Sequence, residues 1–332
     1  VVLLVLAIIW RKRFPVFAFA VLWFLVGHSL ESTVFPLEII HEHRNYLPAL
    51  GPLLGLSYLL VFALPSKMPN ALRISLIAII VFCLGFNTFN RAQYWRSESA
   101  LIESLAMNHP DSPSSQYLRG EILRKREKDF EASYAYYLRA AELSPEEAGF
   151  LISLSMVTPD GLVQHDNTIA SLQLARPDYI AEIIRQKPMS AWGIRALDVA
   201  IKCVMAGNER CLSKADDIAS WLQALIDKSK GKSAHRYYSL VHLFAIRMKQ
   251  NRFFDALTTA DTGLKLNPRN PRFGLMQAHA LIGLKRLDES EKLLNDIQQS
   301  SAGRVRKYAQ RISQLQQSIQ LIRSKQPISV IN

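Results

Sequence analysis

Apolar residues are concentrated in the first ninety positions of the chain and become sparser afterwards. Four long apolar runs fill this part, separated by short polar stretches: Val1–Ile9, Pro15–Leu30, Ala49–Pro65 and Ala71–Phe89. A helix that crosses the hydrocarbon core of a bilayer needs about 17–25 residues, and the complete runs approach or reach this length. Buried helices of a soluble core are the alternative, but successive runs of this kind are rare in soluble domains. We therefore expect residues 1–90 to form a transmembrane region of about four spans, the first of them truncated.

The pattern changes after residue 90, where apolar positions recur at helical spacing. The clearest helix pair covers Ala234–Pro268, and a second covers Pro271–Gln298. A more degenerate pair covers Tyr117–Pro145 and lacks Gly at the usual position of its first helix. Small and large residues alternate in these pairs at the spacing of a tetratricopeptide repeat (TPR). Such repeats bury their apolar faces only by stacking on neighbours, so we expect an α-solenoid of TPR-like helix pairs over residues 91–332.

The segment 146–232 is less regular than the repeats on either side of it. Helical spacing predicts three helices here, at residues 178–185, 194–206 and 214–227, and a terminal helix at residues 303–325. The pattern does not decide whether the three are diverged repeats. The fold class expected for the whole chain is all-α, with polytopic transmembrane helices followed by the solenoid.

Loop charges predict which side of the membrane each part occupies. Arg11, Lys12 and Arg13 precede the second apolar run, and Lys67 and Arg73 flank the turn between the third and fourth. These places share one side of the membrane if each run crosses once, and the positive-inside rule makes that side the cytoplasm. The loop 31–48 and everything after residue 90 then lie outside the cytoplasm, in a bacterial periplasm or the lumen of the endoplasmic reticulum.

The loop 31–48 holds the densest polar run of the membrane region, His41, Glu42, His43, Arg44, Asn45 and Tyr46. Arg44 is suited to a bidentate contact with a phosphate, the two histidines to proton exchange near neutral pH, and Glu42 to acid–base work. Two of these residues also have a simpler possible role: Arg44 as an anchor to lipid headgroups, and Glu42 as the ion-pair partner of Arg44. Two histidines on one loop are too few ligands to predict a metal site.

A resemblance to a known family enters at Arg44-Asn45-Tyr46-Leu47-Pro48-Ala49-Leu50-Gly51. This run resembles the loop of bacterial transmembrane-and-TPR proteins, which are similar to GT-C membrane glycosyltransferases related to protein O-mannosyltransferases. The resemblance implies a polyprenyl-phosphate sugar donor near the loop residues, no other cofactor, and a TPR domain that holds an acceptor or partner protein. The family's catalytic Asp lies in a loop far upstream, so no catalytic residue is assigned here, and activity is expected only of a longer parent protein.

Two alternatives to this function stay open: a membrane-anchored TPR scaffold for envelope assembly that is not an enzyme, and an O-antigen-ligase-like oligosaccharyltransferase. The expected location is the bacterial inner membrane, multi-pass and in contact with its lipids, with the TPR domain in the periplasm. The net charge of +12 is dispersed over helices, so we expect no nucleic-acid partner. The last helix is the most uneven part, because Arg304, Arg306, Lys307, Arg311, Arg323 and Lys325 have no acidic residue among them.

The cysteines carry one further prediction. Cys203 and Cys211 bracket the turn expected between two helices. An extracytoplasmic location permits disulfides, and a helix–turn–helix brings such a pair within bonding reach. We therefore predict a Cys203–Cys211 disulfide, with two buried free thiols as the alternative.

Overall fold

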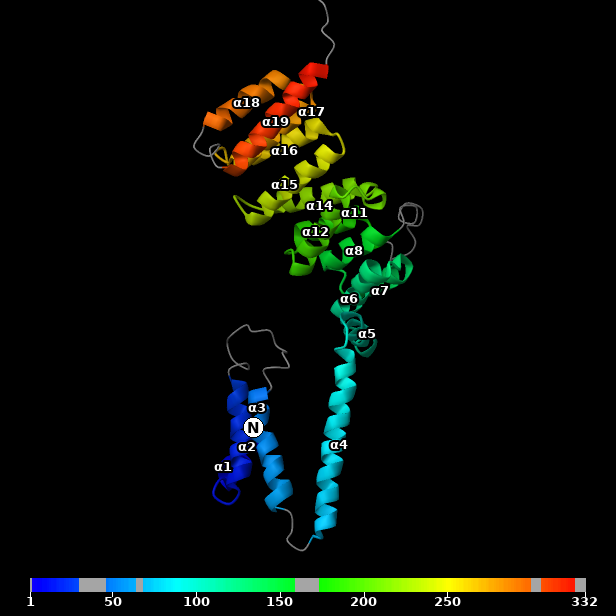
Figure 1. Cartoon of the computed structure of the whole chain (residues 1–332), viewed down its shortest axis with the longest axis vertical. Coiled ribbons are helices and arrows are strands. Elements are labelled where there is room, and N and C mark those ends of the chain that lie inside the picture. The colour runs from blue at the N-terminus through cyan, green and yellow to red at the C-terminus, as the bar shows by residue number, and fades with distance from the viewer. Residues whose placement is uncertain (1, 30–45, 64–67, 159–172, 300–305, 326–332) are drawn as a thin grey trace, which may run out of the picture. The chain divides into compact units, whose positions relative to one another are not determined.

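A computed structural model describes residues 2–29, 46–63, 68–158, 173–299 and 306–325. All regular structure in these residues is helical, as the sequence predicts. The chain divides into two compact units, Val1–Arg96 and Ser97–Asn332 (Figure 1). We call the second the helical unit and describe each by itself.

The first unit contains the apolar helices. They are α1 (Val2–Trp10), α2 (Pro15–Ser29), α3 (Tyr46–Tyr58), the π-helical turn η2 (Leu59–Ala63) and α4 (Asn70–Tyr94). Among the described helices, α4 alone is long and apolar enough to cross a membrane. It has 25 residues and none of its side chains is buried. The further spans predicted from the sequence coincide with shorter helices, so the multi-span arrangement rests on the sequence alone.

Small residues set the distance between α2 and α3. Gly51 and Gly55 are spaced as in a Gly-x-x-x-Gly motif, and a Cβ on either would come within 3.0 Å of Ala20. Such spacing lets two helix backbones approach closely in an apolar environment. The Trp23 indole N–H also donates to the Leu47 carbonyl at 2.8 Å, which links the middle of α2 to the start of α3.

The helical unit is a stack of helix pairs. It starts with α5 (Glu98–Asn108) and ends with α19 (Arg306–Lys325). The first helices of the pairs are α6 (Pro113–Ile122), α8 (Ala148–Val157), α12 (Ala191–Met205), α15 (Ala234–Lys249) and α17 (Pro271–Gly283). The second helices are α7 (Phe130–Leu143), α11 (Pro177–Gln186), α14 (Ala215–Lys228), α16 (Phe253–Leu266) and α18 (Leu287–Gln299). A π-helical turn η3 (Leu123–Glu127) extends α6, and the short helix α13 (Glu209–Leu212) precedes α14.

The predicted helices of the stack are present, whereas α8 and the short helix α13 were not predicted. The pairs expected at 234–268 and 271–298 appear as α15–α16 and α17–α18, and the three middle helices appear as α11, α12 and α14. The sequence reading did not place α8. Nine of its ten residues are buried, so it has no polar face and no helical periodicity that would reveal it.

A recurring turn joins the two helices within several pairs. Lys128, Asn251 and Lys285 each have a left-handed backbone with φ between 56° and 60°, and each follows a first helix. A residue in this conformation ends a helix by satisfying its last carbonyls. Asn251 and Lys285 lie one TPR period of about 34 residues apart. The same turn therefore sets the same antiparallel return in both pairs.

Two phenylalanines interlock α16 with α17. A Cβ on Gly263 of α16 would overlap the ring of Phe273 in α17, and a Cβ on Gly283 of α17 would overlap the ring of Phe253 in α16. Each helix therefore gives one aromatic ring and receives one on a glycine. The exchange fixes the register of two antiparallel helices that belong to successive pairs.

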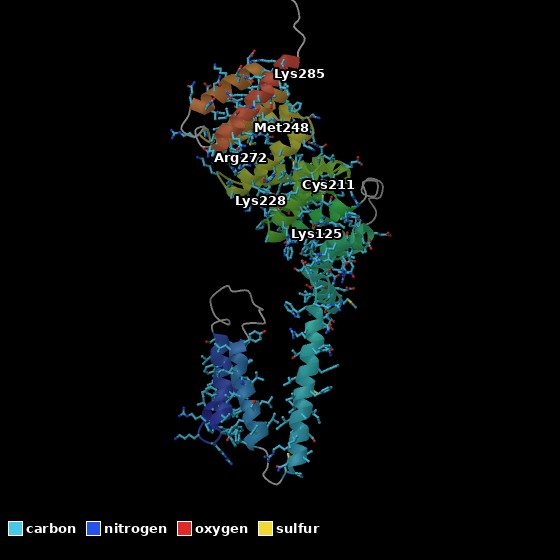
Figure 2. All side chains as sticks on the ribbon, in the orientation of Figure 1. Lys125, Cys211, Lys228, Met248, Arg272 and Lys285 are labelled. Atoms are coloured by element: carbon cyan, nitrogen blue, oxygen red, sulfur yellow. A yellow bond between two sulfur atoms is a disulfide. The ribbon has the colours of Figure 1, made fainter. Side chains whose placement is uncertain are left out.

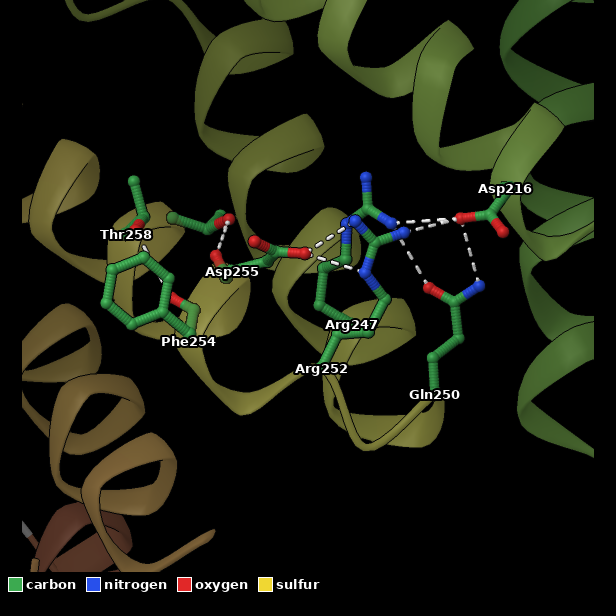
Figure 3. A network of polar contacts seen from close by, with 8 residues as sticks. Asp216, Arg247, Gln250, Arg252, Phe254, Asp255 and Thr258 are labelled. Atoms are coloured by element: carbon green, nitrogen blue, oxygen red, sulfur yellow. Dashed lines mark hydrogen bonds and ion pairs between the residues drawn. The ribbon is translucent and has the colours of Figure 1, made fainter. Parts of the chain in front are cut away.

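Polar contacts at the surface join α14 to α15 and α16 (Figure 3). The Asp216 carboxylate in α14 accepts from Arg247 at 3.0 Å and from Arg252 at 2.9 Å. Arg252 also donates to Asp255 at 2.6 Å. The Asp216 side chain is mostly exposed, and exposed ion pairs contribute about 0–1 kcal/mol each. This network therefore orients the turn after α15, while burial of apolar side chains holds the stack together.

Candidate functional site

Most residues proposed for the lipid-phosphate site lie outside the described part of the chain. They are His41, Glu42, His43, Arg44 and Asn45. Tyr46 is the first residue of α3, and its side chain is exposed. The donor site at this loop therefore stays a prediction.

The structure joins Cys203 and Cys211 by a disulfide, with 5.8 Å between their Cα atoms. Cys203 lies near the end of α12 and Cys211 in α13. Gly207 turns the chain between them with φ of 79°, and the Asn208 N–H donates to the Cys203 carbonyl at 3.4 Å. Both half-cystines line a cavity of about 340 Å³ between the first pairs of the stack.

Replacing both cysteines by Ser is expected to lower the free energy of unfolding of the helical unit by roughly 2–3 kcal/mol, because the bond restricts the unfolded chain over a short loop. Thermal unfolding of the full chain, followed by circular dichroism, measures this loss. Reductant should destabilise the wild type by a similar amount and leave the double variant unchanged. Cys83→Ser is the control, since Cys83 is free and exposed. Equal unfolding midpoints for wild type and double variant would contradict the prediction.

A buried carboxylate occupies the first pair at the position where the TPR pattern has its glycine. Glu121 in α6 accepts from the Tyr137 hydroxyl at 2.5 Å and from Arg124 at 3.0 Å, and it pairs with Lys125. Gly120, one residue earlier, provides the close approach instead: a Cβ there would lie 2.8 Å from the Tyr137 ring. Reading the pair as lacking its glycine was right for that position, but it missed this one-residue shift.

The charges around Glu121 set its ionisation. Burial raises the pKa of the carboxyl. The Arg124 charge and the hydrogen bonds from Lys125 and Tyr137 lower it by more than burial raises it, so the pKa is below its ordinary value. Burial and the Glu121 charge raise the pKa of Tyr137. Tyr137 therefore donates as a neutral phenol and Glu121 accepts as a carboxylate. The partners satisfy one another, which is typical of a structural network in a core.

Glu121 makes the stability of the helical unit depend on acid pH. Its pKa is lower in the folded state than its ordinary 4.5, so its contribution is full above about pH 4.5 and is lost as pH falls through the folded value. Glu121→Gln should lower stability at pH 7 and remove part of this acid-side loss. Unfolding midpoints between pH 3 and pH 7 measure both effects. Glu131→Gln, an exposed carboxylate on α7, is the matched control. An unchanged pH profile in Glu121→Gln would contradict the assignment.

A second cavity of about 510 Å³ opens between α15, α17 and α19, and we call it the C-terminal cavity. Its apolar lining comes from α15 and α17: Val241, Phe244, Ala245, Leu275 and Met276. Its polar lining comes from α17 and α19: Arg272, His279, Lys307, Tyr308, Gln310, Arg311 and Gln314. None of the described residues that line it is acidic.

Helical spacing explains why these side chains face one space. Arg272, Leu275, Met276 and His279 are separated by three, one and three residues, which puts them on one face of α17. Lys307, Gln310, Arg311 and Gln314 repeat the spacing on α19. Figure 2 shows Arg272 at the side of the stack that α19 covers. The cavity therefore combines one stripe from each helix with the apolar face of α15.

Three cations surround the C-terminal cavity without an acidic partner among the described residues: Arg272, Lys307 and Arg311. The Arg272 guanidinium lies over the Tyr237 ring, 5.5 Å from its centre, and Arg311 donates to the Gln314 side chain at 3.2 Å. Burial and the Arg311 charge lower the pKa of His279, so its imidazole is neutral at pH 7. The net charge of the lining is positive.

The structure divides the basic residues of the last helix into two sets. Arg323 pairs with Asp288 and Glu291 of α18, whereas Lys307 and Arg311 face the C-terminal cavity. Sequence reasoning did not find this cavity, because its lining comes from three helices separated along the chain. The stripe from Arg272 to His279 was the available signal.

Comparison with known proteins bears on part of the chain. Residues 89–148 match the tetratricopeptide repeat family, and this segment covers α5, α6 and α7. No curated protein matches the chain. The crystal structure of yeast Tom70 aligns with 68% of this chain and 44% of its own, at 14% identity and a TM-score of 0.35. This chain thus spans less than half of that protein. The chain therefore contains a tetratricopeptide repeat segment within an all-α stack of helix pairs.

Proposed function

We propose that the helical unit is a scaffold that binds a partner protein, and that part of the partner lies in the C-terminal cavity. The observation that carries the proposal is the cavity itself. Its volume of about 510 Å³ is in the range of specific ligand sites. It is lined by α15, α17 and α19, near the C-terminal end of the stack, and stacked helices of this kind create extended binding surfaces. The tetratricopeptide repeat match at residues 89–148 supports the same class of function.

A photo-crosslinking amino acid placed in the cavity tests the proposal. Gln310 is suited to this, because its side chain is exposed and lines the cavity. Illumination of cells that express the full chain should yield one discrete crosslinked product at Gln310. The same amino acid at Thr258, which is exposed on the second helix α16, should not give that product. Identical products at both positions, or none at Gln310, would contradict the proposal.

We further propose that the first unit anchors the helical unit to a bacterial inner membrane. Support comes from the length and exposure of α4, and from exposed Tyr94 and Trp95 at its end, since such rings favour the headgroup region. The Cys203–Cys211 bond supports a periplasmic helical unit, because disulfides persist in oxidising compartments. Reporter fusions at Ser66 and Asn332 should report opposite sides, with Asn332 outside the cytoplasm. Cytoplasmic signal from Asn332 would reverse this orientation.

The glycosyltransferase role rests on the loop resemblance alone. In this proposal the chain is part of a larger membrane enzyme that uses a polyprenyl-phosphate sugar, and Arg44 contacts the donor phosphate. Arg44→Lys keeps the charge but loses the planar fork, so transfer should fall about tenfold, which corresponds to about 1.4 kcal/mol. Arg44 as a headgroup anchor predicts unchanged transfer instead. Scaffold binding does not depend on which result is obtained.

A further inference from the structure

We propose that the C-terminal cavity takes an acidic peptide segment of the partner, in which carboxylates flank a large apolar side chain. The carboxylates lie against Arg272, Lys307 and Arg311, and the apolar side chain sits on Phe244, Leu275 and Met276. This inference rests on the proposed scaffold function and names the chemical class of its partner.

Arg272, Lys307 and Arg311 form a positively charged rim around the C-terminal cavity. Several arginines of the described stack have acidic partners close by: Arg247 has Asp216 at 3.0 Å, and Arg286 has Glu289 at 2.6 Å. The three cavity cations have none within the described residues, and they come from two helices that approach each other. Bringing like charges together is unfavourable unless an anion joins them. A segment with two or more carboxylates supplies that charge in an arrangement that the helices already fix.

Phe244, Leu275 and Met276 form an apolar floor of the same cavity. Phe244 is 6%, Leu275 6% and Met276 8% exposed, so this floor is almost closed to solvent, and no side chain of the described residues fills the cavity above it. His279 lies beside it as a neutral imidazole, because burial and Arg311 lower its pKa. An apolar side chain seated there would remove the remaining apolar surface from water. Met276 is flexible enough to adjust to its shape.

The form of the site favours a peptide over a membrane surface. Headgroups of a bilayer meet a protein on a flat or convex face, whereas these cations surround a recess between three helices. Arg272 is also held in place by its stacking on Tyr237. An extended peptide can place alternate side chains into such a recess and on its rim. An anionic lipid surface is the competing source of the same charge.

Fluorescence anisotropy with the purified full chain in detergent tests the proposal. The probe is a labelled heptapeptide with two glutamates on each side of a leucine–phenylalanine core, and its counterpart has glutamines in place of the glutamates. The acidic peptide should bind at least tenfold more tightly at low salt, and the preference should shrink at 0.5 M salt because the charges are partly exposed. The double variant Lys307→Glu with Arg311→Glu should lose at least tenfold in affinity for the acidic peptide.

A matched double variant isolates the position of the charge. Lys265→Glu with Lys292→Glu changes net charge equally on the second helices α16 and α18, where both side chains are exposed. It should bind within about twofold of the wild type. Circular dichroism establishes that both double variants are folded.

Three results would overturn the inference. One is equal affinity for the acidic and glutamine peptides, and another is equal loss in the two double variants. The third is binding to vesicles of anionic phospholipid that the Lys307 and Arg311 changes abolish, with no binding of the acidic peptide. The scaffold function has a separate readout. Crosslinking at Gln310 persists if only the acidic preference is wrong and disappears if the cavity binds no partner.

Discussion

Replacing Gly149 by Ala is expected to lower the free energy of unfolding of the helical unit by about 3 kcal/mol or more, at the upper end of overpacking effects. Gly149 is in the first turn of α8, and a Cβ there would lie 2.5 Å from the Trp192 carbonyl carbon and 2.7 Å from the Gly193 nitrogen. These are backbone atoms at the start of α12, so no side chain can rotate out of the way. The two helices would have to separate.

Separation at this point also disturbs the caps of both helices. Glu147 accepts from the Gly149 N–H at 3.0 Å and from the Ser190 hydroxyl at 2.6 Å, and Ser190 in turn accepts from the Gly193 N–H at 3.0 Å. One hydrogen-bonded chain therefore caps α8 and α12 together. Moving one helix breaks the cap of the other as well, and each lost cap costs about 1 kcal/mol.

Thermal unfolding of the full chain measures the effect of Gly149→Ala, and a loss of 3 kcal/mol corresponds to a fall of roughly 6–12 °C for a unit of this size. Gly193→Ala is the matched control. A Cβ on Gly193 would lie 2.9 Å from the flexible end of Met189 and in ordinary contact with the Ser190 hydroxyl, at 3.7 Å, so this variant should change the midpoint little. Equal midpoints for the two variants would show that α8 and α12 are not in backbone contact.

Trp221→Ala is the second large effect, with an expected loss of about 3–5 kcal/mol. Trp221 lies in α14 and is fully buried. Its indole N–H donates to the Pro177 carbonyl at 3.1 Å, at the start of α11. Alanine would leave a cavity between two second helices and remove the hydrogen bond between them. Both losses act at the same junction.

Two variants separate packing from the hydrogen bond. Trp221→Phe keeps most of the ring and loses the N–H donor, so it should cost only about 1–2 kcal/mol. Trp95→Ala should leave the helical unit unchanged, because Trp95 is exposed and belongs to the first unit. Chemical unfolding followed by tryptophan fluorescence and circular dichroism measures all three. A loss in Trp221→Ala no larger than in Trp221→Phe would contradict the packing argument.

The helix pairs near the C-terminus were predictable because local signals agree there. Asn270 and Pro271 start α17 with a capping side chain and a proline at the first position, and Ala256, Ala260 and Gly263 mark the buried face of α16. Such signals need only a few consecutive residues. They do not report which helices from different pairs meet, and the register between α16 and α17 depends on two ring-to-glycine contacts.

Most of the candidate site could not be predicted from the sequence, because local signals do not report which helices of different pairs meet. The C-terminal cavity combines Phe244, Met276 and Arg311, and their proximity depends on how α15, α17 and α19 stack. Glu121 was also unpredictable in its role. A glutamate in a degenerate repeat looks like a solvated charge until Tyr137 and Arg124 are seen to surround it. The disulfide is different, because eight residues of separation across one turn make the pairing a local matter.

The exchange of Phe253 and Phe273 between α16 and α17 has a consequence for recognition. Sliding of α17 along α16 would drive both rings out of the spaces above Gly283 and Gly263 at once, so α15–α16 and α17–α18 behave as one rigid body. The distance between the α15 and α17 walls of the C-terminal cavity is then fixed before a partner binds. A preorganised recess loses little conformational entropy on binding. Complexes formed there should therefore differ mainly in how slowly they dissociate.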